Sequence, residues 1–429
     1  MTSSQQYDVL IIGGAMVGSA LACALAQGEY SKHLKIAVVE GNEFSRDGLS
    51  SQSFDPRVSA LTAATRKIFE SLGVWQHIEK FRISPFEGMS VWDAEGTGHI
   101  EFDAMQLAEK QLGHIVENRV VLASILERLE ELAKVDWYCP QKLTNIERTI
   151  ERTTKKTDSK SVGKWAVYLS DNTRLETNLL VGADGALSLV RDLADFEIKQ
   201  KPYEHHSIVT TVKTEKEHGR IARQRFIATG PLALLPLMDY DGAQNHCSIV
   251  WSSEPENAKT IMAMEDEAFC HALGAASEYC LGKILFAEKR FAFPLLERHA
   301  NDYVQEGVAL IGDAAHTIHP LAGQGVNLGF LDAAVLAEEI NRAAGRQIGI
   351  GNLQVLRRFQ RRRKGENALM MATMGGFKTL FGADALPVRW ARNTGMSWMN
   401  QLSPVKNKLM SRAMGLEGDL PNLAKGRPL

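Results

Sequence analysis

The apolar positions near the start of the chain predict a strand, a helix and a second strand. The apolar run 7–12 is typical of a strand buried on both faces, and the residues after it place Leu21, Ala24 and Leu25 at helical spacing. A second apolar run, 36–39, predicts the next strand. This order of elements indicates one unit of an open, mostly parallel sheet.

Two later apolar runs, 179–182 and 308–311, predict further buried strands, and an aspartate follows closely after each. The second run leads into Asp313 and a glycine-rich stretch, 323–329, after which the apolar spacing is helical. We therefore expect a glycine-rich loop that opens a helix, with a carboxylate beside it. Free backbone N–H groups at a helix N-terminus bind anionic ligands.

The middle of the chain has a different pattern. Alternating apolar stretches at 85–100 and 203–295 predict strands of an antiparallel sheet, whereas 148–164 is polar and predicts an exposed hairpin. The expected fold class is α/β, with a Rossmann-like dinucleotide-binding domain interleaved with an antiparallel substrate domain. The expected ranges are 1–84, 101–200 and 296–355 for the first domain, 85–100 and 201–295 for the second, and 356–429 for a helical, basic C-terminal region.

Length and composition narrow the functions to consider. A chain of 429 residues suits two interleaved domains, and the formal net charge of -2 argues against a nucleic-acid partner. The five cysteines lack the spacing of metal ligands, so we expect reduced thiols in a cytoplasmic protein. We expect neither a signal peptide nor an apolar stretch long enough to span a membrane.

The first turn has the spacing of a dinucleotide-binding fingerprint. Glu40 ends the second strand, where it can accept hydrogen bonds from ribose hydroxyls. Ala15 replaces the second glycine of the fingerprint, and its methyl group is expected to displace a bound pyrophosphate slightly. A tight turn without a ligand is the alternative. The predicted cofactor contacts in this turn are Gly13, Gly14, Ala15, Met16, Val17 and Gly18.

Three separated parts of the chain suit one ligand: 13–18, 182–185 with Ser188 and Arg191, and 312–313. Together they resemble the single-component flavoprotein aromatic hydroxylases. The resemblance implies an FAD-binding domain of the glutathione-reductase and p-hydroxybenzoate-hydroxylase type. It also implies that the last aspartate holds the ribityl chain of FAD and that the middle segment contacts FAD and a transient NAD(P)H. The contacts so implied are Asp184, Gly185, Gly312, Asp313, Gly325, Val326 and Asn327.

Further motifs lie at 55–61, 73–75, 88–93, 113–118, 231–237, 247–251 and 412–416. They resemble the ubiquinone-biosynthesis hydroxylases, and the similarity covers nearly the whole chain. Within that group it is closest to the bacterial hydroxylases that act on ring carbon 5 of a 2-polyprenylphenol. Because sister enzymes share most of these motifs, another ring position or another phenolic intermediate of the pathway is the nearest alternative.

The resemblance implies a monooxygenase that uses FAD, NAD(P)H and O2 to hydroxylate a phenol ring, with water excluded from the site. The predicted catalytic residues lie in the loop expected beside the flavin ring and are Pro320, Gly323, Gln324 and Gly325. The N–H groups of this loop would stabilise negative charge on the reduced flavin. Pro320 has no N–H and presents a fixed carbonyl instead.

Several side chains outside the glycine turns are further candidates. We expect Arg57 to contact the FAD phosphate or NAD(P)H, with a surface ion pair as the alternative. Glu117 and Asn118 are expected near the flavin. His316 and His319 have no third ligand nearby in the sequence, so hydrogen-bonded structural roles are expected and no metal site is predicted.

No residue is clearly suited to deprotonate the phenol; Tyr203, His205 and His206 are candidates. The substrate site is expected to be apolar and open-ended, to admit a polyprenyl tail. Plain core packing is the alternative role for its candidate lining residues. These residues are Leu232, Leu234, Leu235, Leu237, Ile249, Trp251 and Phe293.

Basic residues dominate the C-terminal region, where Glu366 and Asp384 are the only acidic residues between 357 and 415. A helical region with a solvated basic face is one interpretation. The other is docking on anionic lipid at the inner face of the plasma membrane, or on sister enzymes in a multi-enzyme complex. Charge reversal of Arg361, Arg362 and Arg363 would test such docking.

Two further classes of protein remain as alternatives. One is a non-catalytic prenyl-lipid-binding scaffold on the same fold, and the other is an FAD oxidase or reductase that transfers no oxygen. Asp184 and Asp313 argue against the scaffold, because a scaffold does not need a carboxylate for the ribityl chain. Ala15 argues mildly for it.

Overall fold

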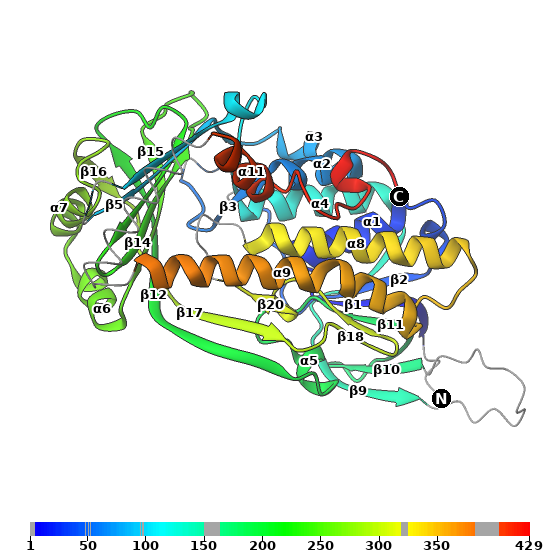
Figure 1. Cartoon of the computed structure of the whole chain (residues 1–429). Helices are drawn as coiled ribbons and strands as arrows, with labels where there is room; N and C mark the ends of the chain where they lie inside the picture. Colours follow the sequence, from blue (N-terminus) through cyan, green and yellow to red (C-terminus); the bar gives the residue numbers. More distant parts are fainter. Residues whose placement is uncertain are drawn as a thin grey trace, which may run out of the picture.

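Two large sheets and the helices packed on them form most of the molecule in the computed structural model (Figure 1). Interleaved parts of the chain build a largely parallel sheet and a largely antiparallel one, which confirms the expected α/β fold class. The structure describes residues 5–47, 49, 51, 53–94, 96, 98–149, 164–318, 325–381 and 403–429.

The first sheet has eight strands in the described part of the chain. Its central strands are parallel neighbours and coincide with the apolar runs of the sequence. The order in space is β18 (Val304–Gln305), β19 (Val308–Leu310), β11 (Arg174–Gly182), β1 (Gln5–Ile12), β2 (Ile36–Val39) and β8 (Val135–Tyr138). β9 (Leu143–Thr149) and β10 (Lys164–Leu169) pair antiparallel beside β11, and the tip of the expected hairpin, 150–163, lies outside the described residues.

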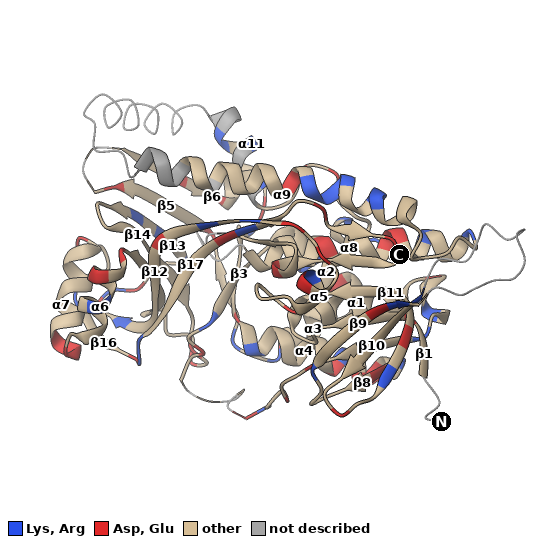
Figure 2. Cartoon of the chain, turned by 90° about the horizontal axis from the view of Figure 1, so that it is seen from below, with Lys and Arg blue, Asp and Glu red and all other residues tan. Residues whose placement is uncertain are grey.

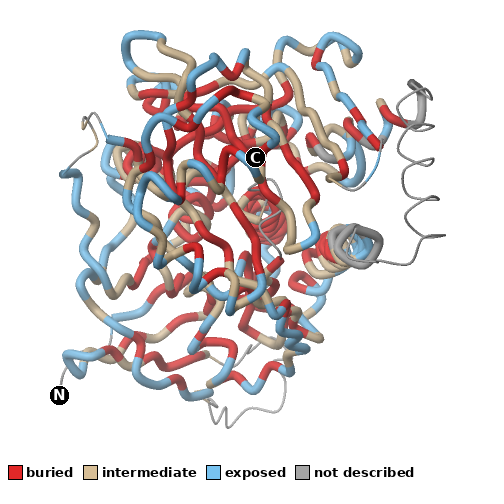
Figure 3. Tube along the Cα trace, turned by 90° about the vertical axis from the view of Figure 1, so that its left-hand side faces the viewer, coloured by how far each residue is buried: buried red, intermediate tan, exposed pale blue. Residues whose placement is uncertain are grey.

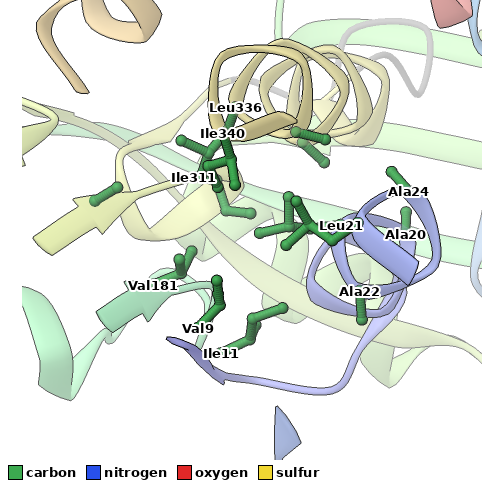
Figure 4. Packing of buried hydrophobic residues seen from close by; sticks show 14 of the residues in the cluster. Val9, Ile11, Ala20, Leu21, Ala22, Ala24, Val181, Ile311, Leu336 and Ile340 are labelled. Atoms are coloured by element: carbon green, nitrogen blue, oxygen red, sulfur yellow. The ribbon is translucent and has the colours of Figure 1, made fainter. Parts of the chain in front are cut away.

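This sheet is buried on both faces, as unbroken apolar runs predict. Val9 and Ile11 of β1 have no exposed surface. Figure 4 shows Leu21 from the first helix close to Ile311 and to Leu336 from a late helix, so the two helices meet over the sheet. The helices of this domain are α1 (Met16–Gln27), α2 (Ala63–Leu72), α3 (Trp75–Ile78), α4 (Asn118–Leu132), α5 (Leu189–Leu193) and α8 (Gly325–Gly345).

The second sheet has nine strands in the described part of the chain, and all but one of its pairings are antiparallel. The order in space is β20 (His316–Thr317), β17 (Phe291–Ala300), β12 (Ile198–Thr214), β15 (His246–Ser253), β14 (Gly230–Leu237), β13 (Ile221–Ile227), β5 (Gly88–Asp93) and β6 (His99–Asp103), with β16 (Ile284–Ala287) beside β12. The sheet therefore extends beyond the expected substrate ranges, to Ile198 and to the short strand β20. Its helices are α6 (Pro255–Ala263) and α7 (Asp266–Ala276), at the left of Figure 1.

The two faces of the nine-stranded sheet have different partners. Its outer face packs against Ile261 of α6 and Phe269 of α7. Its inner face, which includes Leu235 and Leu237, packs with residues of the cofactor domain such as Ile115. The expectation of a substrate lining is wrong for four residues that point to the outer face and its helices: Leu232, Leu234, Ile249 and Trp251.

A small antiparallel sheet lies between the two large ones in the chain's path. Its order is β3 (Val58–Thr62), β7 (Gly113–Glu117) and β4 (Ser84–Phe86). Ala60 of β3 and Ile115 of β7 belong to the apolar cluster that joins the domains. This sheet therefore seats the antiparallel domain on the cofactor domain.

The C-terminal region packs back on the cofactor domain. α9 (Leu353–Phe381) runs along α8, and α11 (Ser403–Ala413) follows later in the chain (Figure 1). Leu423 is buried, and its carbonyl accepts a hydrogen bond from Ser71 Oγ of α2 at 3.1 Å. Figure 3 shows the buried segments gathered in the interior of the molecule. None of the helices in the described ranges is both long enough and apolar enough to cross a bilayer.

His114 on β7 is a buried titratable group of the small sheet. Its ring packs edge-on against Trp75 with 4.8 Å between the centroids, and its Nε2 lies 2.9 Å from Gln111 Nε2. Burial, helped by the charge of Arg66, lowers the pKa of His114 to about 4. The folded chain therefore holds this imidazole neutral across most of the acidic range.

We predict that the chain loses stability as the pH falls from 7 to 5. Between the unfolded pKa of 6.5 and the folded pKa of about 4, the unfolded chain binds the His114 proton and the folded chain does not. The contribution of the neutral ring is thus complete above pH 6.5 and lost toward pH 4. It should lower the free energy of unfolding by about 2 kcal/mol at pH 5, measured by urea denaturation. His114→Phe should decline less than the wild type, and exposed His33→Gln should decline equally; an unchanged decline in His114→Phe would contradict the prediction.

Candidate cofactor site

The three glycine-containing turns meet at one edge of the parallel sheet. Because β1, β11 and β19 run parallel, their carboxyl ends lie side by side, where open α/β sheets bind ligands. The N–H of Ala183 donates to the carbonyl of Ile12 at 2.8 Å, and that of Ile311 donates to Gly182 at 3.0 Å. The structure therefore brings together the predicted residues of all three turns.

Close contacts require glycine at two positions of the first turn. Gly13 has a φ of +103°, and a Cβ there would lie 2.3 Å from the carbonyl oxygen of Ala183. A Cβ at Gly18 would lie 1.9 Å from the carbonyl oxygen of Gly13. Ala15 is the N-cap residue of α1 and makes no side-chain capping bond, so the first N–H groups of the helix remain available to an anionic ligand.

Glu40 reaches across the first turn from the end of β2. Its Oε2 accepts the N–H of Gly14 at 2.8 Å, and its Oε1 accepts the N–H of Asn42 at 2.9 Å. Each oxygen keeps a second lone pair for a ribose hydroxyl. Val17 packs toward Gly312 of the third turn, because a Cβ at Gly312 would lie 3.3 Å from its Cγ1. The contacts of Ala15, Met16 and Val17 with a cofactor stay predictions.

Asp184 of the middle turn is engaged within the protein. Its carboxylate accepts hydrogen bonds from Ser188 Oγ at 2.5 Å and from the N–H groups of Leu189 and Val190 at 2.7 and 3.2 Å. Burial raises its pKa, and these bonds partly offset the rise. Gly185 has a φ of +82°, and a Cβ there would meet no atom within 4 Å, so its backbone is the open part of this turn.

Asp313 is the free carboxylate of the site. Its side chain is exposed, and no hydrogen-bond donor of the described residues lies within bonding distance of it. Burial nevertheless raises its pKa, against the nearby charges of His316 and Arg298. A carboxylate has both properties when it lines a recess, where its surface is accessible but protein atoms replace much of the surrounding water. Such a group can accept hydrogen bonds from ligand hydroxyls.

A buried carboxylate, Asp332 of α8, lies behind this turn. Its Oδ2 accepts the N–H of Gly312 at 3.1 Å and bonds His316 Nε2 at 2.5 Å. Its Oδ1 accepts from Arg363 Nε at 2.7 Å and from Asn367 Nδ2 at 3.1 Å. Burial alone would raise the pKa of Asp332, but the charges of His316 and Arg363 outweigh it and hold the pKa below its usual value.

This network corrects one sequence expectation and supports another. Arg363 is buried, and Arg362 pairs with Asp419 at 2.7 Å, so neither is free to form the expected docking surface. Arg361 is exposed. His316 has the hydrogen-bonded role that we expected. Sequence reasoning missed Asp332, although its position on the buried face of a strongly apolar helix was a usable signal.

Arg57 and Asn118 lie next to each other at the start of α4. The N–H of Asn118 donates to the carbonyl of Arg57 at 2.9 Å, and its Oδ1 accepts from Ser59 Oγ at 2.6 Å. The exposed guanidinium of Arg57 lies over the ring of Phe293, 5.1 Å from its centroid. No carboxylate in the described ranges pairs with Arg57, so the alternative of a surface ion pair is not what the structure has. Cofactor contacts of Arg57 and Asn118 stay predictions.

Glu117 is committed to a buried ion cluster. Its carboxylate pairs with Arg82 at 3.0 Å and with Arg119 at 2.6 Å, and it accepts the N–H of Asp55 at 2.7 Å. The guanidinium of Arg82 is stacked 4.0 Å from the ring centroid of Phe54. These contacts make Glu117 a structural tie of the segment before Arg57.

The predicted catalytic loop is described only at its two ends. His319, Pro320, Gly323 and Gln324 lie outside the described residues. Gly325 and Val326 form the first turn of α8, at the expected helix start. The side chain of Asn327 is buried and bonds within the protein, where its Oδ1 accepts from Thr65 Oγ1 and Thr62 N, and its Nδ2 donates to Ala60 O.

The candidates for phenol activation lie on or beside β12. His205 Nδ1 is 2.8 Å from the carbonyl of Tyr203, which engages one ring nitrogen. Tyr203 is buried. No contact of these residues or of His206 assigns a role in proton transfer, so that role stays a prediction.

One cluster of side chains in the described ranges has the geometry of a metal site: His77, Glu127 and Glu131. Lys80 pairs with Glu127 at 2.7 Å, and Arg128 pairs with Glu131 at 2.8 Å. These cations already neutralise both carboxylates, and the cluster is remote in the chain from every glycine turn. It does not define a metal site.

The arrangement at the sheet edge fits FAD. The open N-terminus of α1 suits a pyrophosphate, the half-buried Glu40 suits a ribose, and the free carboxylate of Asp313 suits a polyhydroxyl chain. The three groups come from different turns of the same edge, as a long dinucleotide requires. When bound, FAD supplies redox chemistry that protein side chains lack.

Comparison with known proteins agrees with this geometry. The FAD binding domain family matches residues 6–347, and the squalene epoxidase family matches residues 292–419. The mitochondrial ubiquinone biosynthesis monooxygenase COQ6 of Xenopus tropicalis is 34% identical, over 96% of this chain and 94% of the relative. The 3-demethoxyubiquinol 3-hydroxylase of Escherichia coli is 33% identical, over 96% and 100%. The crystal structure of p-nitrophenol 4-monooxygenase PnpA from Pseudomonas putida is similar in fold, with a TM-score of 0.75 at 17% identity over 97% of this chain and 99% of the other.

The fold and the site therefore define an FAD-dependent aromatic monooxygenase. FAD is its cofactor, and NAD(P)H is the co-substrate typical of this class. Within the class, the chain belongs to the family of ubiquinone-biosynthesis flavoprotein hydroxylases.

Replacing Gly13 by alanine should weaken FAD binding. The new Cβ would collide with the Ala183 carbonyl at a backbone φ of +103°, which alanine rarely adopts. We expect the dissociation constant for FAD, measured by fluorescence quenching, to rise by about tenfold or more, equivalent to about 1.4 kcal/mol. Gly365→Ala in exposed helix α9, where a Cβ would meet nothing within 4 Å, is the matched control and should bind FAD normally. Normal affinity in Gly13→Ala would contradict this account of the turn.

Proposed function

We propose that the enzyme hydroxylates the aromatic ring of a 2-polyprenylphenol at C5, using NAD(P)H and O2, as a step of ubiquinone biosynthesis. The main support is that relatives named for this pathway match the chain over nearly its whole length, while all three cofactor turns are intact. The resemblance of motifs such as 231–237 to the C5 hydroxylases supports the ring position.

The residues of the chain hold the cofactor and shelter the reaction. The first N–H groups of α1 suit the pyrophosphate, and Glu40 and Asp313 suit the ribose and ribityl hydroxyls. Arg57 supplies an exposed positive charge beside Phe293 for a phosphate of FAD or NAD(P)H. Once bound, FAD reacts with O2, and the surrounding protein must keep water away from the reacting ring.

The inner face of the nine-stranded sheet is suited to an apolar substrate. Leu235, Leu237 and Val250 are on this face, together with Phe54 of the segment before Arg57. Phe293 lies on the same face, opposite Ser207 in the β12–β17 register. An apolar surface between the two domains favours a prenylated ring over a charged phenol, because burying a charge without a partner is costly.

A different ring position is the second candidate. The relative from Escherichia coli is a 3-demethoxyubiquinol 3-hydroxylase and is nearly as similar as the COQ6 relative. The fold and cofactor turns serve either reaction equally, so product structure distinguishes the two.

The test is to incubate the FAD-loaded enzyme with NADPH, oxygen-18 gas and a short-chain 2-prenylphenol. We expect a product heavier by one labelled oxygen atom in mass spectra, with the new hydroxyl at C5 in NMR spectra. A hydroxyl at another carbon would favour the second candidate. Reactions without the phenol provide the control, in which NADPH consumption should yield peroxide and no product.

Other outcomes would overturn the proposal. NADPH consumption that yields only peroxide in the presence of the phenol would mean that the proposed substrate is wrong. Turnover of a different product without labelled oxygen would indicate an oxidase or reductase. Absence of NADPH consumption by FAD-loaded protein would favour the non-catalytic prenyl-lipid-binding scaffold.

We also propose that the enzyme works as a cytoplasmic protein in peripheral contact with the inner face of the plasma membrane, where its substrate and sister enzymes meet. The Lys and Arg residues of α9 gather in its first half (Figure 2). Arg357 and Arg361 are exposed there, whereas Arg363 is buried. Exposed basic side chains favour anionic headgroups, by about 1 kcal/mol for each residue near the surface.

The charge-reversal test therefore changes Arg357 and Arg361 to glutamate and leaves Arg363 intact. The double variant should bind vesicles of anionic phospholipid at least about tenfold more weakly in sedimentation, because it loses two attractive charges and gains two repulsive ones. Lys283→Glu with Lys289→Glu, on exposed residues of the other domain, is the control of equal charge. Equal binding by both double variants would rule out docking through α9, including docking within a complex assembled on the membrane.

A further inference from the structure

Arg363 of α9 is a buried charge directed at the cofactor site. Its side chain is 4% exposed and its Nε lies 2.7 Å from Asp332 Oδ1. Its Nη2 also donates to Asn367 Oδ1 at 2.7 Å. A buried ion pair loses much of its attraction to desolvation, so stability alone is a weak reason for it. The groups that the pair holds in place indicate its role.

The carboxylate of Asp332 divides its two oxygens between two parts of the chain. Its Oδ2 bonds the N–H of Gly312 and the ring of His316, which are the two ends of the segment that carries Asp313. Its Oδ1 bonds Arg363 of α9. Because a carboxylate is planar and rigid, a shift of Arg363 is transmitted to both ends of this segment.

α9 supports the same region a second time, further along the helix. Met371 packs with Ile318 and Leu328, one on each side of the predicted catalytic loop. The helix therefore contacts the chain through Asp332 before the loop and through Met371 around it. The Asp313 carboxylate, which has no partner of its own among the described residues, depends on these contacts for its orientation.

We propose that Arg363 is a positioning residue of the flavin site: through Asp332 it fixes the segment 312–316, so that the Asp313 carboxylate is oriented toward the ribityl chain of FAD. The inference rests on FAD as the cofactor and is independent of the ring position that the enzyme hydroxylates. It assigns to the C-terminal region a part in cofactor binding that its basic composition does not reveal.

The test compares Arg363→Met with Arg362→Met. Both changes remove one arginine charge from the same turn of α9, but Arg362 pairs with Asp419 and Glu338 and does not contact the segment 312–316. We expect the dissociation constant for FAD, from fluorescence quenching, to rise about tenfold or more in Arg363→Met and to stay within about twofold in Arg362→Met. Asp332→Asn should resemble Arg363→Met.

A double variant tests whether the two residues act through each other. If Arg363 acts through Asp332, the combination of Arg363→Met and Asp332→Asn should weaken FAD binding no more than the worse single change. Arg363→Lys keeps the charge without the planar fork and should recover part of the affinity. This conservative variant keeps the test informative if Arg363→Met folds poorly.

A purely structural role would give different results. At saturating FAD, the flavin absorption spectrum and midpoint potential of Arg363→Lys should differ from those of the wild type, whereas those of Arg362→Met should not. Equal losses of FAD affinity in Arg363→Met and Arg362→Met, or additive losses in the double variant, would overturn the proposal. A wild-type enzyme that binds FAD but releases no hydroxylated phenol would defeat the proposed substrate and leave this comparison intact.

Discussion

A charge without any contact with water organises the centre of this molecule. The carboxylate of Asp332 is fully buried, and it stays ionised only because His316 and Arg363 approach it from two directions. Removing one partner of such a pair typically costs on the order of 3–5 kcal/mol, because the other charge is left unpaired. The relative position of α8, α9 and the third glycine turn is therefore coupled to one planar group. The remaining parts of the site are arranged around that turn.

The two sheets make separate contributions to the site. The parallel sheet aligns three turns from distant parts of the chain, since neighbouring parallel strands end at the same edge. The nine-stranded sheet contributes an apolar inner face, while its outer face is covered by α6 and α7. The buried cluster around Arg82 and Glu117 joins the domains beside Arg57. Cofactor binding and substrate binding thus rest on different kinds of sheet.

The parts of this structure that depend on local pattern could be predicted from the sequence, and the parts that depend on packing could not. The strands 7–12 and 308–311 and the glycine at position 13 follow from apolar runs and from backbone geometry. Leu232 and Leu235 are both buried, so burial alone does not show which face of the sheet each one is on. Arg363 is one of four consecutive basic residues, and only the contact of α9 with α8 distinguishes it from Arg361. For the same reason Asp332 was missed.

The interleaved path of the chain has a consequence for how the protein is made. β19 pairs with β11 beside β1, but it is synthesised only after the whole nine-stranded sheet has left the ribosome. Until then the exposed edge of β11 has no neighbour, and the first glycine turn exists without the carboxylate that completes its ligand site. The antiparallel domain can form earlier, as an insertion within a half-built partner. The flavin is therefore best regarded as a late addition during biogenesis, and a growing chain that stalls before residue 308 should expose an unpaired strand edge to chaperones or to other nascent chains.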